Sequence, residues 1–286
     1  LDNSGQLDPL LAKIAFIFIL IGYGTKVGLA PMHTWKPDAY SKAPAPMGAL
    51  LAGALLPVAF VIILKFKIIT DASVGADFSQ QLLIVFGLLS ITLAALVMFN
   101  ARNYKRMLAY SSIENAGIMA LGFGFGGIGI FATILHLIYH SITKVILFLT
   151  AGNMLLKFSS DKINKVSGTL SIVPLSSALL IIGFLIITGT PPFGIFLTKM
   201  QILLAGMQTY PVVSGLALLF MGIIFISFLK HITAMVFGDS EADIKPGEDG
   251  LWLLIPPTVF LGIIIYLSFT LPPFLKTLIT EATNIY

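Results

Sequence analysis

The sequence has no cysteine and few charged residues. The lack of cysteine excludes disulfides, thiolate nucleophiles, zinc–cysteine sites and iron–sulfur ligation. Only 10% of the 286 residues are charged, against about 25% in soluble domains. Apolar residues make up 57%, and the mean hydropathy is +0.97. This composition excludes a soluble enzyme and favours a polytopic membrane protein. The net charge of +4 gives no case for nucleic-acid binding.

Long apolar runs predict the fold. Backbone groups cannot stay unpaired in lipid, so each run of spanning length is expected to be a helix. The predicted spans are 10–32, 45–66, 79–100, 107–126, 128–156, 170–206, 211–236 and 251–271. The sequence therefore predicts an all-α, polytopic membrane helix bundle of about eight transmembrane helices.

One predicted span, 170–206, is interrupted by Gly189, Pro191, Pro192 and Gly194. Proline removes a backbone donor and clashes with the preceding turn, so this run predicts a broken helix. Transporters place such breaks beside buried ion sites, which favours a functional break. The alternative is two shorter helices, or one kinked helix, without a role in function.

The basic residues predict the orientation of the chain. The loops and adjoining span ends on one side hold ten of them: Lys36, Lys42, Arg102, Lys105, Arg106, Lys157, Lys162, Lys165, Lys230 and Lys245. The other side holds four: Lys13, Lys65, Lys67 and Lys276. The positive-inside rule then puts the first side in the cytoplasm and both ends of the chain outside.

We expect four further charged residues to lie inside spans rather than at span ends: Lys26, Glu114, Lys144 and Lys199. A charge at the centre of a spanning helix costs at least about 2.5–3.5 kcal/mol, so these residues are candidates for function. A buried carboxylate needs a partner, and for Glu114 we expect Lys144 or Lys199. By contrast, Arg102, Lys105, Arg106 and the acidic residues of 239–249 are expected to be solvated loop charges.

His136, His140 and Lys144 are spaced four residues apart, so they share one face of a helix over about 12 Å. Histidine titrates near neutrality, and burial favours the uncharged form of lysine, so this ladder can pass protons through intervening water. Metal binding by the two histidines would need further ligands, and the sequence offers no second cluster of histidine, aspartate or glutamate. Haem ligation would need paired histidines on facing helices, and the other two histidines, His33 and His231, lie at span edges. Each histidine could instead form only a structural hydrogen bond.

Three motifs resemble a known family. They are KVGLAPMHTWKPDAY at 26–40, KRMLAYSSI at 105–113, and the His136-x3-His140-x3-Lys144 ladder. All three resemble the antiporter-like subunits of respiratory complex I, Mrp-type cation/proton antiporters and group 4 membrane-bound hydrogenases. The resemblance covers essentially the whole chain. The sequences Gly-Tyr-Gly-Thr-Lys and Ser-Ile-Glu-Asn favour the hydrogenase branch.

The resemblance implies a fold and a domain organisation. Family members typically have fourteen helices with two inverted five-helix repeats, each with a broken helix. This chain is similar to helices seven to fourteen, as a single membrane domain 1–286. Residues 1–78 would end the first repeat, 79–236 would form the second, and 237–286 would be a loop and the last helix. The first six helices would belong to a separate chain or to a part missing from this sequence.

The resemblance also implies roles for the charged residues. Lys26 matches the lysine of a first half-channel, whose glutamate partner lies on the fifth helix, outside this sequence. The His136, His140 and Lys144 ladder matches a central relay, and Lys199 matches the ionisable residue of a second half-channel. Many members carry a further lysine where this sequence has Pro57. The proton path from Lys26 to the ladder would therefore rely on water or on the His136 end of the ladder.

The predicted function is proton translocation by an antiporter-like subunit of a hydrogenase-type or complex-I-like redox complex. Such a subunit would lie in a prokaryotic cytoplasmic membrane, among lipid and other membrane subunits, including whatever supplies the first six helices. We expect no catalytic residue, metal or cofactor in this chain, because electron chemistry would belong to the partners. The alternatives are an Mrp-type sodium/proton antiporter subunit and a structural subunit that does not conduct.

Overall fold

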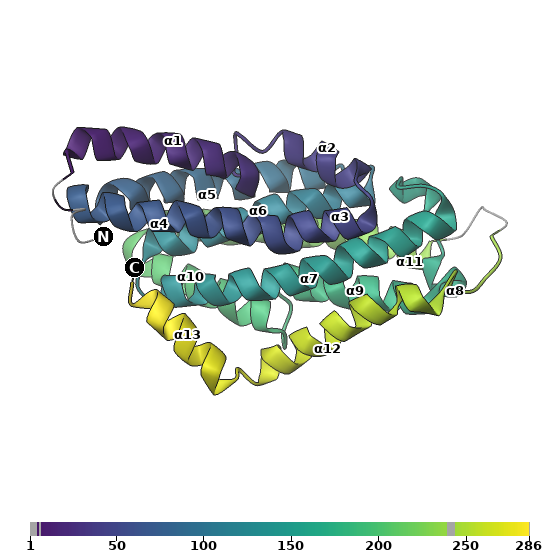
Figure 1. The fold of residues 1–286 in the computed structure, drawn as a ribbon. Coiled ribbons are helices and arrows are strands. Elements are labelled where there is room, and N and C mark those ends of the chain that lie inside the picture. Colours follow the sequence, from purple (N-terminus) through teal and green to yellow (C-terminus); the bar gives the residue numbers. More distant parts are fainter. Residues whose placement is uncertain (1–4, 6, 239–243, 286) are drawn as a thin grey trace.

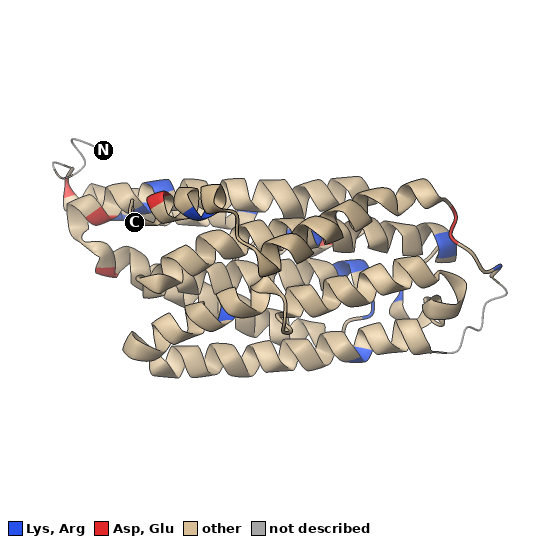
Figure 2. Ribbon diagram, turned by 90° about the horizontal axis from the view of Figure 1, so that it is seen from below, with Lys and Arg blue, Asp and Glu red and all other residues tan. Residues whose placement is uncertain are grey.

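The computed structural model describes residue 5 and residues 7–238 and 244–285. Within these ranges the chain is helical and has no β-strand. Figure 1 shows long helices packed side by side along one axis, with α1 beginning and the last helix ending at the same end of the bundle. Charged residues are sparse along these helices (Figure 2). The fold is the all-α bundle that the sequence predicts.

Helices occupy all eight predicted spans. They are α1 (Pro9–Val27), α3 with η2 and α4 (Ala45–Leu50, Leu51–Leu55, Leu56–Val74), α5 (Ala76–Met98), α6 (Tyr104–Phe125), α7 (Ile128–Phe158), α9 with α10 (Pro174–Thr188, Gly194–Thr209), α11 (Pro211–Phe237) and α12 (Ile255–Phe269). The shorter helices and single turns are α2 (Trp35–Lys42), η3 (Ile163–Lys165), α8 (Thr169–Ile172), η4 (Leu251–Leu253) and α13 (Pro273–Thr283).

Six of the described helices are long and apolar enough to cross a membrane, rather than eight. The two predicted spans that fall short do so for different reasons. The predicted break divides α9 from α10, and neither half reaches spanning length alone. Helix α6 is too polar, but every residue in it except Arg106 is buried. A helix surrounded by protein need not be apolar, because its neighbours rather than lipid solvate it.

Three boundaries differ from the prediction. Helix α1 ends at Val27 rather than near residue 32, because Gly28 adopts the left-handed conformation (φ 85°) that ends helices. Helix α4 continues to Val74, beyond the predicted end at 66. The chain also ends in an unpredicted helix, α13, which contacts α7 (Figure 1).

Close packing around α6 sets the centre of the bundle. A Cβ atom on Gly87 of α5 would lie 2.8 Å from the carbonyl oxygen of Gly117 on α6, so only glycine permits this approach. A smaller core joins α1, α4 and α6 through Phe16, Phe60 and Phe123. The larger core extends over α5 to α7 and α9 to α11. Helix α6 therefore lies between the two, where its polar residues face protein.

Candidate functional site

The break between α9 and α10 positions a buried ion pair. The Nζ of Lys199 lies 2.9 Å from Oε1 of Glu114, and both residues are at most 3% exposed. The same Nζ donates to the carbonyl of Ile187, 3.1 Å away at the end of α9. The negative end of a helix dipole stabilises a cation there. Of the two partners predicted for Glu114, the structure brings Lys199 to it.

Gly189 makes this geometry possible. It follows α9 with φ 80°, and its N–H donates to the carbonyl of Ile186, which closes the helix end. A Cβ atom at this position would lie 3.0 Å from Cδ of Lys199. The lysine stem therefore passes against the glycine and turns back to the end of α9. The predicted break residues Pro191, Pro192 and Gly194 continue the turn into α10.

Asn115 joins the ion pair to the histidine ladder. Its Nδ2 donates to Glu114 and to the carbonyl of Ser111, and its Oδ1 lies 3.0 Å from Nε2 of His136. The other ring nitrogen of His136, Nδ1, lies 2.8 Å from the hydroxyl of Thr198. A continuous hydrogen-bonded chain therefore runs from Lys199 through Glu114 and Asn115 to His136.

His136 can be satisfied in two protonation states. Since Asn115 donates elsewhere, its Oδ1 accepts from Nε2–H of the ring. The hydroxyl of Thr198 has two acceptors within reach, Nδ1 of His136 at 2.8 Å and the carbonyl of Ile195 at 3.0 Å. With a neutral ring, the hydroxyl donates to Nδ1. With both nitrogens protonated, Nδ1–H donates to the hydroxyl oxygen, which turns to Ile195.

The rest of the ladder is equally buried. The Nζ of Lys144 donates to the hydroxyl of Ser111 and to the carbonyl of Leu108, 2.8 Å away. His140 lies one turn before Lys144 and is fully buried, and neither of its ring nitrogens has a hydrogen-bond partner in the described part of the chain. Buried polar groups are nearly always hydrogen-bonded, so we expect water at His140.

Lys26 lies on the surface of the described bundle. Helix α1 packs through a face that includes Phe16 and Leu20, and Lys26 is exposed on another face. Its Nζ lies 5.4 Å from the ring centroid of Tyr23, and it forms no ion pair with any described residue. With Phe18 and neighbouring residues it lines a shallow pocket of about 370 Å³. The structure therefore separates Lys26 from the other predicted site residues.

Two lysines outside the predicted spans are buried, and one of them, Lys105, was predicted to be a solvated loop charge. Lys36 is 0% exposed and donates to the carbonyl of Val27 over 2.6 Å. Lys105 is 1% exposed and donates to the carbonyl of Ala43 over 2.7 Å. The prediction for Lys105 was wrong because its ammonium group, like that of Lys36, turns inward to a backbone carbonyl that the turns beside α2 leave free.

Of the other predicted loop charges, Arg102 and Arg106 lie at the surface, whereas Glu248 is partly buried and its carboxylate accepts from the N–H and the hydroxyl of Ser176. Arg106 forms an exposed ion pair with Asp38 at 2.7 Å. Of the acidic stretch 239–249, residues 239–243 lie outside the described residues, and Asp249 pairs with Lys157 at 2.9 Å. In the α1–α2 turn, burial lowers the pKa of His33.

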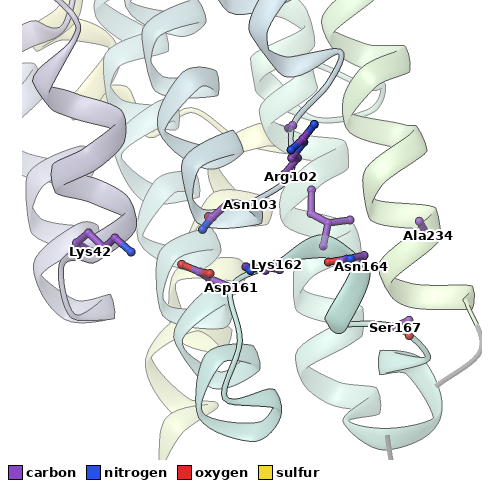
Figure 3. Close-up of a pocket in the computed structure, with 10 residues that line it drawn as sticks. Lys42, Arg102, Asn103, Asp161, Lys162, Asn164, Ser167 and Ala234 are labelled. Carbon is purple, nitrogen blue, oxygen red and sulfur yellow. The ribbon is translucent and has the colours of Figure 1, made fainter. Parts of the chain in front are cut away.

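A pocket of about 760 Å³ lies apart from the relay. Figure 3 shows its polar residues on α2 and on the segments before α6 and after α7. Its polar lining comprises Lys42, Arg102, Asn103, Asp161, Lys162, Asn164 and Ser167. Within the described residues, no group of three or more histidine, aspartate or glutamate side chains is placed to hold a metal.

Fold and site together define an integral membrane protein with a chain of buried ionisable groups at its centre. The family model described as "NADH:quinone oxidoreductase/Mrp antiporter, TM" matches residues 4–227. The chain belongs to this family.

Three similar proteins illustrate the relationship. A hydrogenase-4 component F homolog of Methylacidiphilum infernorum (isolate V4) is 40% identical over 248 residues, which cover 86% of this chain and 52% of the relative. A chain of the membrane-bound sulfane sulfur reductase, an archaeal respiratory membrane complex, superposes with a TM-score of 0.88 at 25% identity, over 98% of this chain and 57% of that one. A chain of the Mrp complex from Dietzia sp. DQ12-45-1b shares the fold, with a TM-score of 0.87 at 21% identity over 99% of this chain and 61% of that one. The present chain thus spans about half the length of the curated relative.

Proposed function

We propose that this chain translocates protons as an antiporter-like subunit of a hydrogenase-type membrane redox complex. The observation that carries the proposal is the buried hydrogen-bonded chain from Lys199 through Glu114 and Asn115 to His136. The relative named as a hydrogenase-4 component F homolog supports the hydrogenase assignment. We place the complex in a prokaryotic cytoplasmic membrane, with the basic loops inside and both ends of the chain outside.

The geometry suggests how charge moves along this chain. When His136 takes up a proton, rotation of the Thr198 hydroxyl keeps the ring hydrogen-bonded. The new positive charge repels the ammonium of Lys199, because like charges repel strongly in a low dielectric. Water at His140 would connect His136 to Lys144 on the same helix face. Release outside would follow from Lys199, the ion-pair partner of Glu114.

Lys26 indicates where the rest of the complex packs. A lysine on the lipid-facing side of a spanning helix is costly, so the exposed face of α1 calls for a partner. We infer that a membrane helix carrying a carboxylate covers Lys26, and that it belongs to the six helices which precede this part of the family fold. The other subunits and lipid would cover the remaining apolar surface.

Ion dependence separates this proposal from the sodium/proton antiporter alternative. Redox-driven uptake is measured in sealed vesicles that hold the assembled complex, with a pH-sensitive dye for protons and radioactive sodium for the cation. Our proposal predicts that proton uptake is unchanged in sodium-free medium. Loss of proton uptake without sodium, together with sodium movement in the opposite direction, would contradict it and favour the antiporter.

A further inference from the structure

The α1–α2 turn and the α9–α10 turn, here called the first and the second break, hold lysines in the same way. Gly28 ends α1 with φ 85°, and Gly189 ends α9 with φ 80°. The Nζ of Lys36 donates to the last carbonyl of α1, that of Val27, at 2.6 Å. The Nζ of Lys199 donates to Ile187 at the end of α9, at 3.1 Å. Each break thus returns an ammonium group to the end of the helix before it.

The glycines show how closely the two sites correspond. A Cβ atom on Gly28 would lie 2.5 Å from Cδ of Lys36, and one on Gly189 would lie 3.0 Å from Cδ of Lys199. In both breaks the lysine stem fills the space that the missing Cβ leaves. Lys36 therefore occupies the place in the first break that Lys199 occupies in the second.

The two sites differ in their counter-ions. Lys199 is paired with Glu114, whereas Lys36 forms no ion pair within the described part of the chain. Lys36 is fully buried in α2, outside the six candidate spans, and its charge interacts with that of Lys144. Burial, and then this like charge, lower the pKa of Lys36 well below its usual value. A buried lysine without a carboxylate is one that exchanges its proton readily.

Aromatic contacts join Lys36 to the helix that carries the central ladder. Its Nζ lies 5.3 Å from the ring centroid of Tyr40, and the Tyr40 ring lies 5.5 Å from that of Phe148. Phe148 is one helical turn beyond Lys144 on α7. The ring nitrogens of His140, one turn before Lys144, are both unpaired among the described residues. Lys36 thus contacts the end of α1 directly and the ladder helix α7 through Tyr40.

We propose that Lys36 is the proton carrier that links the Lys26 end of α1 to the His140 and Lys144 group. This inference rests on the proposed function and deepens it. In the transfer, the N–H bond of the Lys36 ammonium breaks and its proton passes, through water, to a ring nitrogen of neutral His140. The products are a neutral amine on Lys36 and an imidazolium on His140.

The test compares three substitutions of Lys36 with a control on the same helix. Redox-driven proton uptake is measured in vesicles holding the assembled complex with Lys36→Leu, Lys36→Arg or Lys36→His, and with Lys42→Leu at an exposed lysine of α2. We expect uptake below about a tenth of native with leucine and with arginine, because arginine stays protonated. Histidine titrates, so it should restore part of the uptake and shift its pH dependence. Lys42→Leu should behave as native.

If Lys36 only caps the end of α1, the opposite result is expected. Arginine would then retain native uptake, because it can still donate to the Val27 carbonyl, and that result would overturn the proposal. If Lys36→Leu fails to assemble, arginine and histidine decide: an active arginine variant, or a histidine variant no better than arginine, counts against Lys36 as a carrier. If Lys144→Ala stops uptake while the Lys36 variants do not, the inference fails alone. If Lys144→Ala also has no effect, the proposed function fails with it.

Discussion

Replacing Glu114 with glutamine is expected to destabilise the subunit by about 3–5 kcal/mol, the usual cost of breaking a buried ion pair from one side. The substitution leaves the ammonium of Lys199 without its partner at 2.9 Å, in a site where both side chains are almost fully buried. The measurement is the free energy of unfolding of the full-length subunit in detergent, from denaturant titration followed by circular dichroism.

A double variant separates the charge from the packing. In Glu114→Gln with Lys199→Met, neither member of this pair leaves an uncompensated charge behind, so we expect most of the lost stability to return. Proton transport should nevertheless stay absent, because both ionisable groups are gone. If Glu114→Gln alone kept native stability, the ion pair would not be the buried, mutually dependent pair described above.

Asn115 offers the second large effect, because two substitutions there should differ. Asn115→Leu fills a similar volume with an apolar group and removes the hydrogen bonds to Glu114 and His136. We expect proton uptake to fall below about a tenth of native, the scale on which a positioned proton-transfer group acts. Asn115→Ala leaves room for water between the same two groups, so its uptake should lie clearly above that of the leucine variant.

The control for this pair is Asn153→Leu, a partly buried asparagine on α7 whose side-chain contacts, to Ser176 and Leu253, lie outside the relay. It should leave redox-driven proton uptake close to native. Equal uptake by the Asn115→Leu and Asn115→Ala variants would show that Asn115 does not bridge Glu114 and His136.

The sequence was sufficient for the fold because spanning length and backbone satisfaction leave few choices. Apolar runs in lipid must be helices, and the Gly189 to Gly194 stretch cannot continue one. The helix ends were harder to predict from the sequence. The apolar run after Val27 looks continuous, and only the left-handed Gly28 shows that α1 stops there.

The site was predicted less completely, because burial depends on which face of a helix packs. Lys26 and Lys199 are both lysines within apolar stretches, yet α1 turns one outward while α10 turns the other toward Glu114. Lys36 lies in a polar stretch that reads as a loop, and its burial arises only when the chain folds back over the end of α1.

Asn115 and Thr198 were missed for a related reason. The residue next to Glu114 points about 100° away around the helix, so adjacency in sequence does not show a shared network. Asn115 reaches His136 only because α6 and α7 pack together, and Thr198 reaches the same ring from α10. A polar run inside a span was the available signal, and it indicated the helix without indicating the partners.

The central claim is that the buried ladder lies on the path of the proton. Its most direct test is redox-driven proton uptake into vesicles that hold the assembled complex, comparing native protein with Lys144→Ala and with Lys165→Ala at an exposed lysine. Assembly and electron transfer are measured on the same preparations. Our account predicts that Lys144→Ala loses proton uptake while redox turnover continues, and that Lys165→Ala keeps both. Unchanged uptake in an assembled Lys144→Ala complex would contradict it and favour a structural subunit that does not conduct.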